Sequence, residues 1–179
     1  MFSNGSYVKV GEPAGTWTPS VAQTTFAQQY TAHPNINSVV TPNDDNANAV
    51  ISYLQSKQIK AKTFPTTGQD ATLQGMINVL QGYQCGSVYK AVYLEAQDAV
   101  AIATILRAGL TPPSALVNGT TSPPTGVAGS AQPASLLVPT WVDSKNMGAT
   151  VVKDKFVTAS ALCAAVTAAV CTANNIPNP

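Results

Sequence analysis

Four side chains with complementary hydrogen-bonding and stacking properties each follow a predicted strand. They are Trp17, Asn43, Asp70 and Lys90. A sugar hydroxyl both donates and accepts hydrogen bonds, so an amide, a carboxylate and an ammonium can together serve both functions. The C–H face of a sugar ring is apolar and can lie against the flat surface of an indole. This set of residue types therefore predicts a monosaccharide-binding site.

Each of these residues also has a purely structural explanation. Trp17 is equally suited to cover the core beneath a loop. Asn43 and Asp70 stand where side-chain caps of the following helices are expected, and a lone Lys90 is usually a solvated surface charge. The binding hypothesis therefore depends on the shared position of the four residues at the strand ends.

The elements that must position these side chains alternate between short apolar segments and amphipathic helices. Strands are predicted over residues 7–11, 36–41, 60–64 and 87–89. Helical spacing of apolar residues follows Thr18-Pro19 and recurs from Ala47 and from Leu73, and a fourth helix is predicted over 91–108. This alternation predicts an α/β fold with a parallel, doubly wound sheet. Ligands of such sheets bind beyond the carboxyl ends of the strands, where the four side chains are expected.

The second half of the chain follows a different pattern. Residues 109–135 are rich in Pro, Gly, Ser and Thr and are predicted to form a long loop. A late strand is predicted over residues 136–142, where Pro139 favours a sheet edge or a crossing between lobes. An Ala-rich tail over residues 159–173 is predicted to be helical.

The tail also carries two of the three cysteines, Cys163 and Cys171. A disulfide between them requires that the tail not be one straight helix, because a helical segment of this length would separate them by ~12 Å. Free or buried thiols are the alternative, and the sequence leaves both open.

Composition and motifs exclude several classes of protein. Only 9% of the residues are charged and the net charge is +1, without the basic block of a nucleic-acid binder. The sequence has a single histidine and no CxxC pair, so no metal site is predicted. The strand-end loops contain no nucleophile elbow, phosphate loop or dinucleotide fingerprint. We therefore predict neither an enzyme nor a cofactor.

Several segments, in order along the chain, resemble one family. Val39-Val40-Thr41-Pro42-Asn43-Asp44, Gly68-Gln69-Asp70-Ala71 and Ser87-Val88-Tyr89-Lys90 resemble three successive strand ends of the xylose-binding protein family. This family belongs to the type I periplasmic sugar-binding proteins of ABC transporters. Residues 136–139 and 150–157 resemble its last crossover strand and C-terminal segment, so the resemblance is collinear over most of the chain.

The resemblance implies a two-lobed, hinged protein with the sugar between the lobes. Trp17 matches the family's ring-stacking tryptophan, and Asn43, Asp70 and Lys90 match its hydroxyl-binding residues. Pro42, Asn46 and Asn48 depart from the residues usual in the family, which leaves the sugar open between a xylose-like pentose and a hexose.

Family members are roughly twice as long, as two lobes of ordinary size require, so the resemblance implies that this chain is the C-terminal half of a longer protein. Residues 1–90 are expected to form an incomplete C-terminal ligand-binding lobe. Residues 91–135 are expected to pack on an N-terminal lobe that the sequence lacks, and residues 136–179 to return to the C-terminal lobe as crossover strand and tail. The expected partners are a monosaccharide, the membrane permease of an ABC transporter, and either the absent lobe or a second copy of the chain. The expected location is periplasmic or extracellular, with a lipid anchor as an option for the parent protein.

Two alternatives to an importer subunit share this fold. One is a ligand-sensing receptor module, and the other is the effector domain of a sugar-responsive transcription regulator that has lost its helix-turn-helix by truncation. A partner domain elsewhere in the parent protein would distinguish them.

Overall fold

The computed structural model of the protein describes residues 4–177 and separates into two units. Within the described residues, the first unit comprises residues 4–89 and 141–177, and the second comprises residues 90–140. The outer ends of the predicted domains, at residues 1–3 and 178–179, lie outside the described residues. Over residues 4–177, every helix is too short or too polar to cross a membrane.

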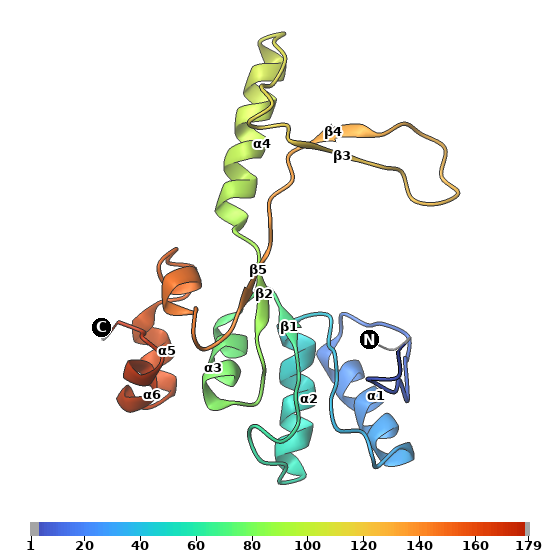
Figure 1. Cartoon of the computed structure of the whole chain (residues 1–179), viewed down its shortest axis with the longest axis vertical. Helices are drawn as coiled ribbons and strands as arrows, with labels where there is room; N and C mark the ends of the chain where they lie inside the picture. Colours follow the sequence, from blue (N-terminus) through green and yellow to red (C-terminus); the bar gives the residue numbers. More distant parts are fainter. Residues whose placement is uncertain (1–3, 178–179) are drawn as a thin grey trace. The chain divides into compact units, whose positions relative to one another are not determined.

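The first unit is a row of helices next to a small sheet (Figure 1). Its helices are α1 (Pro19–Ala32), α2 (Asp44–Ser56), α3 (Leu73–Gln81), α5 (Ala159–Ala165) and α6 (Ala168–Ala173). A five-residue π-helix, Gly148–Val152, precedes α5. Each of α1, α2, α3 and α5 packs against the next in this order, and α5 packs against α6. The strands β1 (Gly68–Gln69), β2 (Ser87–Tyr89) and β5 (Thr140–Val142) form a sheet in the order β1-β2-β5. The pair β1 and β2 is parallel and is connected through α3, so the fold is mixed α/β with a βαβ unit.

The helices predicted from apolar periodicity are confirmed, and their ends have local causes. Helix α1 begins at Pro19, a position where the fixed φ of proline suits the first turn. Asn43 caps α2 by accepting the N–H of Asn46, and Thr72 caps α3 by accepting the N–H of Gly75. Gly82 closes α3 in the left-handed region at φ 81°, which glycine adopts without steric cost.

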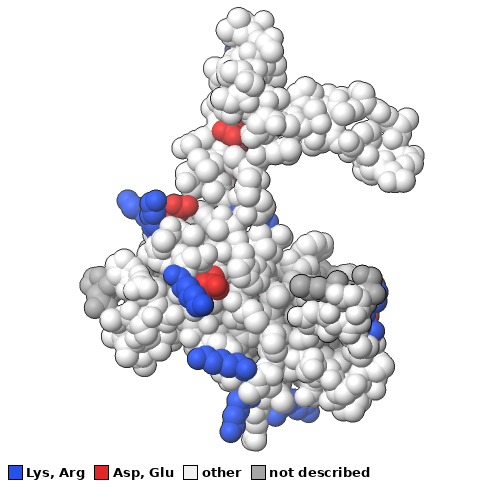
Figure 2. Space-filling view, viewed as in Figure 1, with Lys and Arg blue, Asp and Glu red and all other residues white. Residues whose placement is uncertain are grey.

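The core between α1 and α2 is aromatic. Phe26 of α1 contacts Tyr53 of α2 and Phe64 edge to face, with ring centroids 5.8 and 5.9 Å apart. Val50 and Leu54 of α2 complete this buried cluster. On the face of the molecule shown in Figure 2, by contrast, charged side chains are sparse, as expected from the low charged fraction of the sequence.

Of the four strands predicted before residue 90, three are absent or much reduced. Residues 7–11 form no strand, and Val8 is 80% exposed. In the segment 36–41, only Val39 pairs, in an isolated parallel bridge with Thr66. Residues 60–64 form turns, and β1 begins later, at Gly68. Next to the Val39–Thr66 bridge, hydrogen bonds between side chain and backbone take the place of a continuous ladder. Thr41 Oγ1 donates to Thr67 O, and Thr67 Oγ1 accepts the N–H of Thr41.

The second unit contains α4 (Val92–Arg107) and an antiparallel hairpin. The hairpin strands β3 (Gly119–Thr121) and β4 (Gln132–Ala134) lie within residues 109–135, which the sequence predicted to be loop throughout. The late strand predicted over residues 136–142 is limited to β5. None of the residues of α4 is buried, although the helix carries many large apolar side chains.

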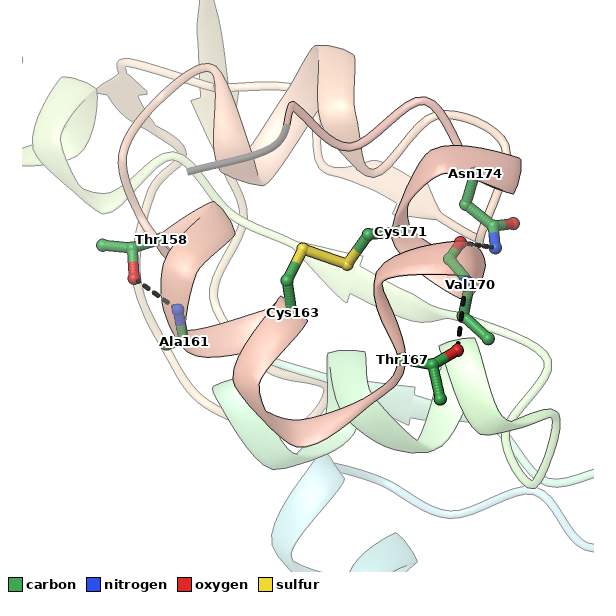
Figure 3. Close-up of a disulfide and its surroundings, with 7 residues drawn as sticks. All are labelled: Thr158, Ala161, Cys163, Thr167, Val170, Cys171 and Asn174. Carbon is green, nitrogen blue, oxygen red and sulfur yellow. Dashed lines mark hydrogen bonds between the residues drawn. A yellow bond between two sulfur atoms is a disulfide. The ribbon is translucent and has the colours of Figure 1, made fainter.

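The C-terminal tail is not one helix, and this break permits a disulfide. Val166 is extended, and Thr167 starts α6 by accepting the N–H of Val170 with its hydroxyl. The two short helices turn toward each other and bring the Cα atoms of Cys163 and Cys171 to 5.9 Å, where they form a disulfide (Figure 3). The break in the helical tail that a disulfide between these cysteines requires is therefore present.

We expect the substitution Cys163→Ser to lower the free energy of unfolding by about 2–3 kcal/mol, because the disulfide restricts the unfolded chain. Urea denaturation with and without reductant measures this loss. The matched control is Cys85→Ser, since Cys85 is exposed and forms no disulfide. Equal stability of both variants and of the reduced protein would contradict the expectation.

Candidate functional site

A buried carboxylate joins three elements of the first unit near the predicted strand ends. Asp44, the first residue of α2, is fully buried. Its Oδ2 accepts the N–H of Thr72 at 2.7 Å and the hydroxyl of Thr72 at 3.2 Å. Its Oδ1 accepts the hydroxyl of Ser87 and the amide N–H of Gln84, both at 2.8 Å. Asp44 therefore holds the start of α2 to the start of α3 and to β2.

Two glycines leave room for this carboxylate. A Cβ atom at Gly68 in β1 would overlap Asp44 Oδ1, and a Cβ at Gly75 in α3 would overlap Asp44 Oδ2. Burial raises the pKa of the Asp44 carboxyl above its ordinary value, and the hydrogen bonds from Ser87, Gln84 and Thr72 partly oppose this shift. The four donors provide the compensation that a buried carboxylate requires.

Asn43 and Asp70, two of the predicted binding residues, flank this network. Asn43 is half-buried and caps α2, as its structural explanation anticipated. Asp70 follows β1 and is also half-buried, but the cap of α3 is Thr72. The capping explanation is therefore wrong for Asp70. Because Asp44 bonds to Thr72, the chain segments that carry Asn43 and Asp70 are held next to each other.

Trp17 lies in the loop before α1, and this loop is bonded to the start of α2. The side-chain amide of Asn46 donates to Thr16 O at 2.7 Å. The side chain of Trp17 itself is 74% exposed, so it does not cover the core. The loop that carries this exposed indole is therefore held at the start of α2, the helix that Asn43 caps.

Lys90, the fourth predicted residue, directly follows β2 and is half-buried. It is the first residue of the second unit. The structure thus brings together the segments of Trp17, Asn43 and Asp70 within the first unit, while Lys90 begins the other unit. The binding role of all four stays a prediction.

The polar groups that sequence reasoning missed are Asp44, Thr72, Gln84 and Ser87. In the sequence, Asp44 stands out only as the last residue of a family-like segment, and its burial became visible only in the fold. The glycines at positions 68 and 75 were the available signal, since both mark a close approach of another group to the backbone. Among residues 4–177, no cluster of three or more metal-ligating side chains occurs.

The parallel βαβ unit is that of a mixed α/β protein, and a comparison with known families identifies the class. Residues 2–110, more than half of the chain, match the family described as periplasmic binding protein domain. The chain therefore belongs to the periplasmic binding protein family, whose members bind ligands and are not enzymes.

Two curated relatives are periplasmic sugar-binding proteins. The D-xylose-binding periplasmic protein of Escherichia coli is 34% identical over 143 residues, which cover 78% of this chain and 40% of the relative. The protein of the same name from Haemophilus influenzae is 29% identical and covers 87% of this chain and 45% of the relative. The chain thus spans less than half the length of these relatives.

Solved structures agree on the fold. A carbohydrate transporter solute-binding protein from Chloroflexus aurantiacus, in complex with D-glucose, matches 81% of this chain and 42% of its own with a TM-score of 0.69 and 23% identity. An ABC transporter solute-binding protein from Clostridium phytofermentans, with bound β-D-glucose, matches 90% of this chain and 52% of its own, also with a TM-score of 0.69, at 22% identity.

The close approach of Asp44 to Gly75 predicts that replacing this helical glycine by alanine lowers stability instead of raising it. Replacing glycine by alanine inside a helix ordinarily stabilises by about 0.5–1 kcal/mol. We expect Gly75→Ala to destabilise by about 1–3 kcal/mol instead, because the new methyl group displaces the Asp44 carboxylate from its donors. Urea denaturation of the variant measures the sign.

Gly15→Ala is the control for this substitution, since a Cβ at Gly15 meets no atom within 4 Å. It should leave stability nearly unchanged. A Gly75→Ala variant as stable as the unsubstituted protein would mean that the carboxylate is not held as described.

Proposed function

We propose that this chain is the C-terminal ligand-binding part of a solute-binding protein that captures a monosaccharide, a xylose-like pentose or a hexose, for a sugar ABC importer. The observation that carries the proposal is the hydrogen-bonded connection of three separate segments. Asn46 to Thr16 and Asp44 to Thr72 tie the loops of Trp17, Asn43 and Asp70 to one end of α2. An indole, an amide and a carboxylate near one another offer what a sugar ring needs, a stacking surface with donors and acceptors.

The curated relatives support the choice of ligand, because both are named for binding D-xylose. In the proposed arrangement, the sheet is the doubly wound parallel sheet of a two-lobed protein, and the sugar binds at its strand ends. Lys90 is the fourth ligand-binding residue, and the membrane permease of the importer is the downstream partner. The disulfide supports a periplasmic or extracellular location, since disulfides persist in oxidising compartments.

The apolar side chains of α4 support a docking role for residues 91–135. Val92, Val100 and Leu106 are each at least half exposed, and no residue of α4 is buried. Exposing such a side chain forfeits roughly 1.5–3 kcal/mol relative to burial, so a face of this kind is usually covered. The proposed cover is an N-terminal lobe, consistent with relatives more than twice as long as the matched region.

Calorimetry of the full-length protein against a panel of pentoses and hexoses tests the proposed function. At least one monosaccharide should bind, and Asp70→Asn should weaken its binding by about 2 kcal/mol, roughly 30-fold, because a charge-assisted hydrogen bond is lost. Asparagine suits this test because it tolerates the positive φ of 92° at position 70 better than alanine does.

The melting temperature of Asp70→Asn is the control measurement and should change little. Binding of amino acids or nucleotides alone would overturn the proposed function. A lower melting temperature with unchanged sugar affinity would show that Asp70 acts only on the fold.

Light scattering of the isolated 179-residue chain tests the proposed docking role. We expect the chain to self-associate, and Val100→Ser with Leu106→Ser to shift it toward the monomer, because both remove exposed apolar surface from α4. Val8→Ser removes an exposed apolar side chain from the first unit and is the control. A stable monomer with a cooperative melt would contradict the proposal that α4 needs a cover.

A further inference from the structure

The backbone after β1 adopts an unfavourable conformation at two consecutive residues. Asp70 has φ 92° and Ala71 has φ 50°, both in the left-handed region of backbone conformation that residues other than glycine rarely adopt. Such a conformation persists only where surrounding contacts hold it. This conformation sets the direction in which the Asp70 side chain leaves the backbone.

Two of the three backbone hydrogen bonds that hold this segment lead to one carboxylate, that of Asp44. Ser87 Oγ accepts the N–H of Ala71 at 3.0 Å and donates its own proton to Asp44 Oδ1. Asp44 Oδ2 accepts the N–H of Thr72, the next residue along the chain. The N–H of Asp70 is bonded to Val88 O at 2.8 Å, so β2 holds the first residue of the segment directly. Asp44 thus holds the two residues after Asp70, one directly and one through Ser87.

The adjacent carboxylate does not share this role. Asp45 also lies in the first turn of α2, but it is exposed. The two residues carry the same charge at neighbouring positions and differ in burial and in contacts. Asp45 therefore provides a matched control for any substitution at Asp44.

We propose that Asp44 is a positioning residue for ligand binding, which fixes the conformation of residues 70–72 and thereby aims the Asp70 carboxylate at the ligand. The inference rests on the proposed function, because it takes Asp70 as a residue that contacts the sugar. Asp44 itself does not touch the sugar. Its carboxylate is completely buried, and all four of its hydrogen-bond donors come from the protein.

The test compares Asp44→Asn and Asp45→Asn in the full-length protein, with D-xylose and D-glucose as the probes. In the first variant, the amide that replaces the buried carboxylate would place an N–H group against one pair of donors. We expect sugar affinity to fall at least about tenfold in Asp44→Asn, because the aim of Asp70 is lost, and to stay within about twofold in Asp45→Asn. Amide hydrogen exchange should accelerate at Ala71 and Thr72 in Asp44→Asn only.

A double-mutant cycle with Asp70→Gly separates positioning from general destabilisation. Glycine adopts positive φ without strain and has no side chain to aim. If Asp44 acts through Asp70, adding Asp44→Asn to Asp70→Gly should cost less than about twofold in affinity. Losses that add in full would overturn the inference, as would an Asp44→Asn protein that melts earlier but binds sugar normally.

A second variant covers the case in which Asp44→Asn does not fold. Ser87→Ala removes only the hydroxyl between Asp44 and Ala71, and it should weaken sugar binding and accelerate exchange at Ala71. Normal affinity in Ser87→Ala would then overturn the inference. If the unsubstituted protein binds no sugar of the panel, the proposed function falls, and this inference falls with it. If it binds and the variants bind equally well, only the inference falls.

Discussion

The buried carboxylate of Asp44 is the contact on which the arrangement of the first unit depends. The strands of its sheet are only two or three residues long, so the backbone ladder supplies few hydrogen bonds to fix the helices that flank it. Asp44 accepts four hydrogen bonds from the start of α3, from β2 and from the turn between them. Displacing a buried carboxylate from its donors costs about 1–3 kcal/mol, a substantial part of the stability of a domain. The position of α2 relative to α3 and β2 is therefore strongly specified.

This contact also connects the fold to the candidate binding residues. The loops that carry Asn43 and Asp70 lie next to the network, and the loop of Trp17 reaches the same helix end through Asn46. A rigid framework below exposed or half-buried side chains is what a binding site requires, because disorder in those side chains would have to be removed when the ligand binds. The strained backbone at Asp70 and Ala71 fits this arrangement, since strain tends to gather at functional positions.

The rest of the chain follows other constraints. The two threonine caps at Thr158 and Thr167 divide the tail into short helices, and the disulfide then holds them together (Figure 3). Helix α4 contains no fully buried residue, and several of its large apolar side chains are exposed. The disulfide and the exposed apolar side chains of α4 are both consistent with a chain that belongs to the periplasmic binding protein family and covers less than half of each curated relative.

The sequence by itself determined helices α1 to α4, the parallel βαβ unit, the family and the four candidate binding residues. Apolar periodicity and caps act over a few residues, so they can be read locally, as in α2 with its cap Asn43 or α3 with the closing Gly82. The extent of the strands could not be read in this way, because pairing depends on a distant partner, and residues 7–11 and 36–41 lack the continuous ladder that their composition suggested. Only the tertiary structure showed that Asp44, rather than Asp45, is buried, and that Thr72, rather than Asp70, caps α3. The burial of Asp44 depends on residues far away in sequence, Thr72 and Ser87, whose proximity is created by packing and not by local preference.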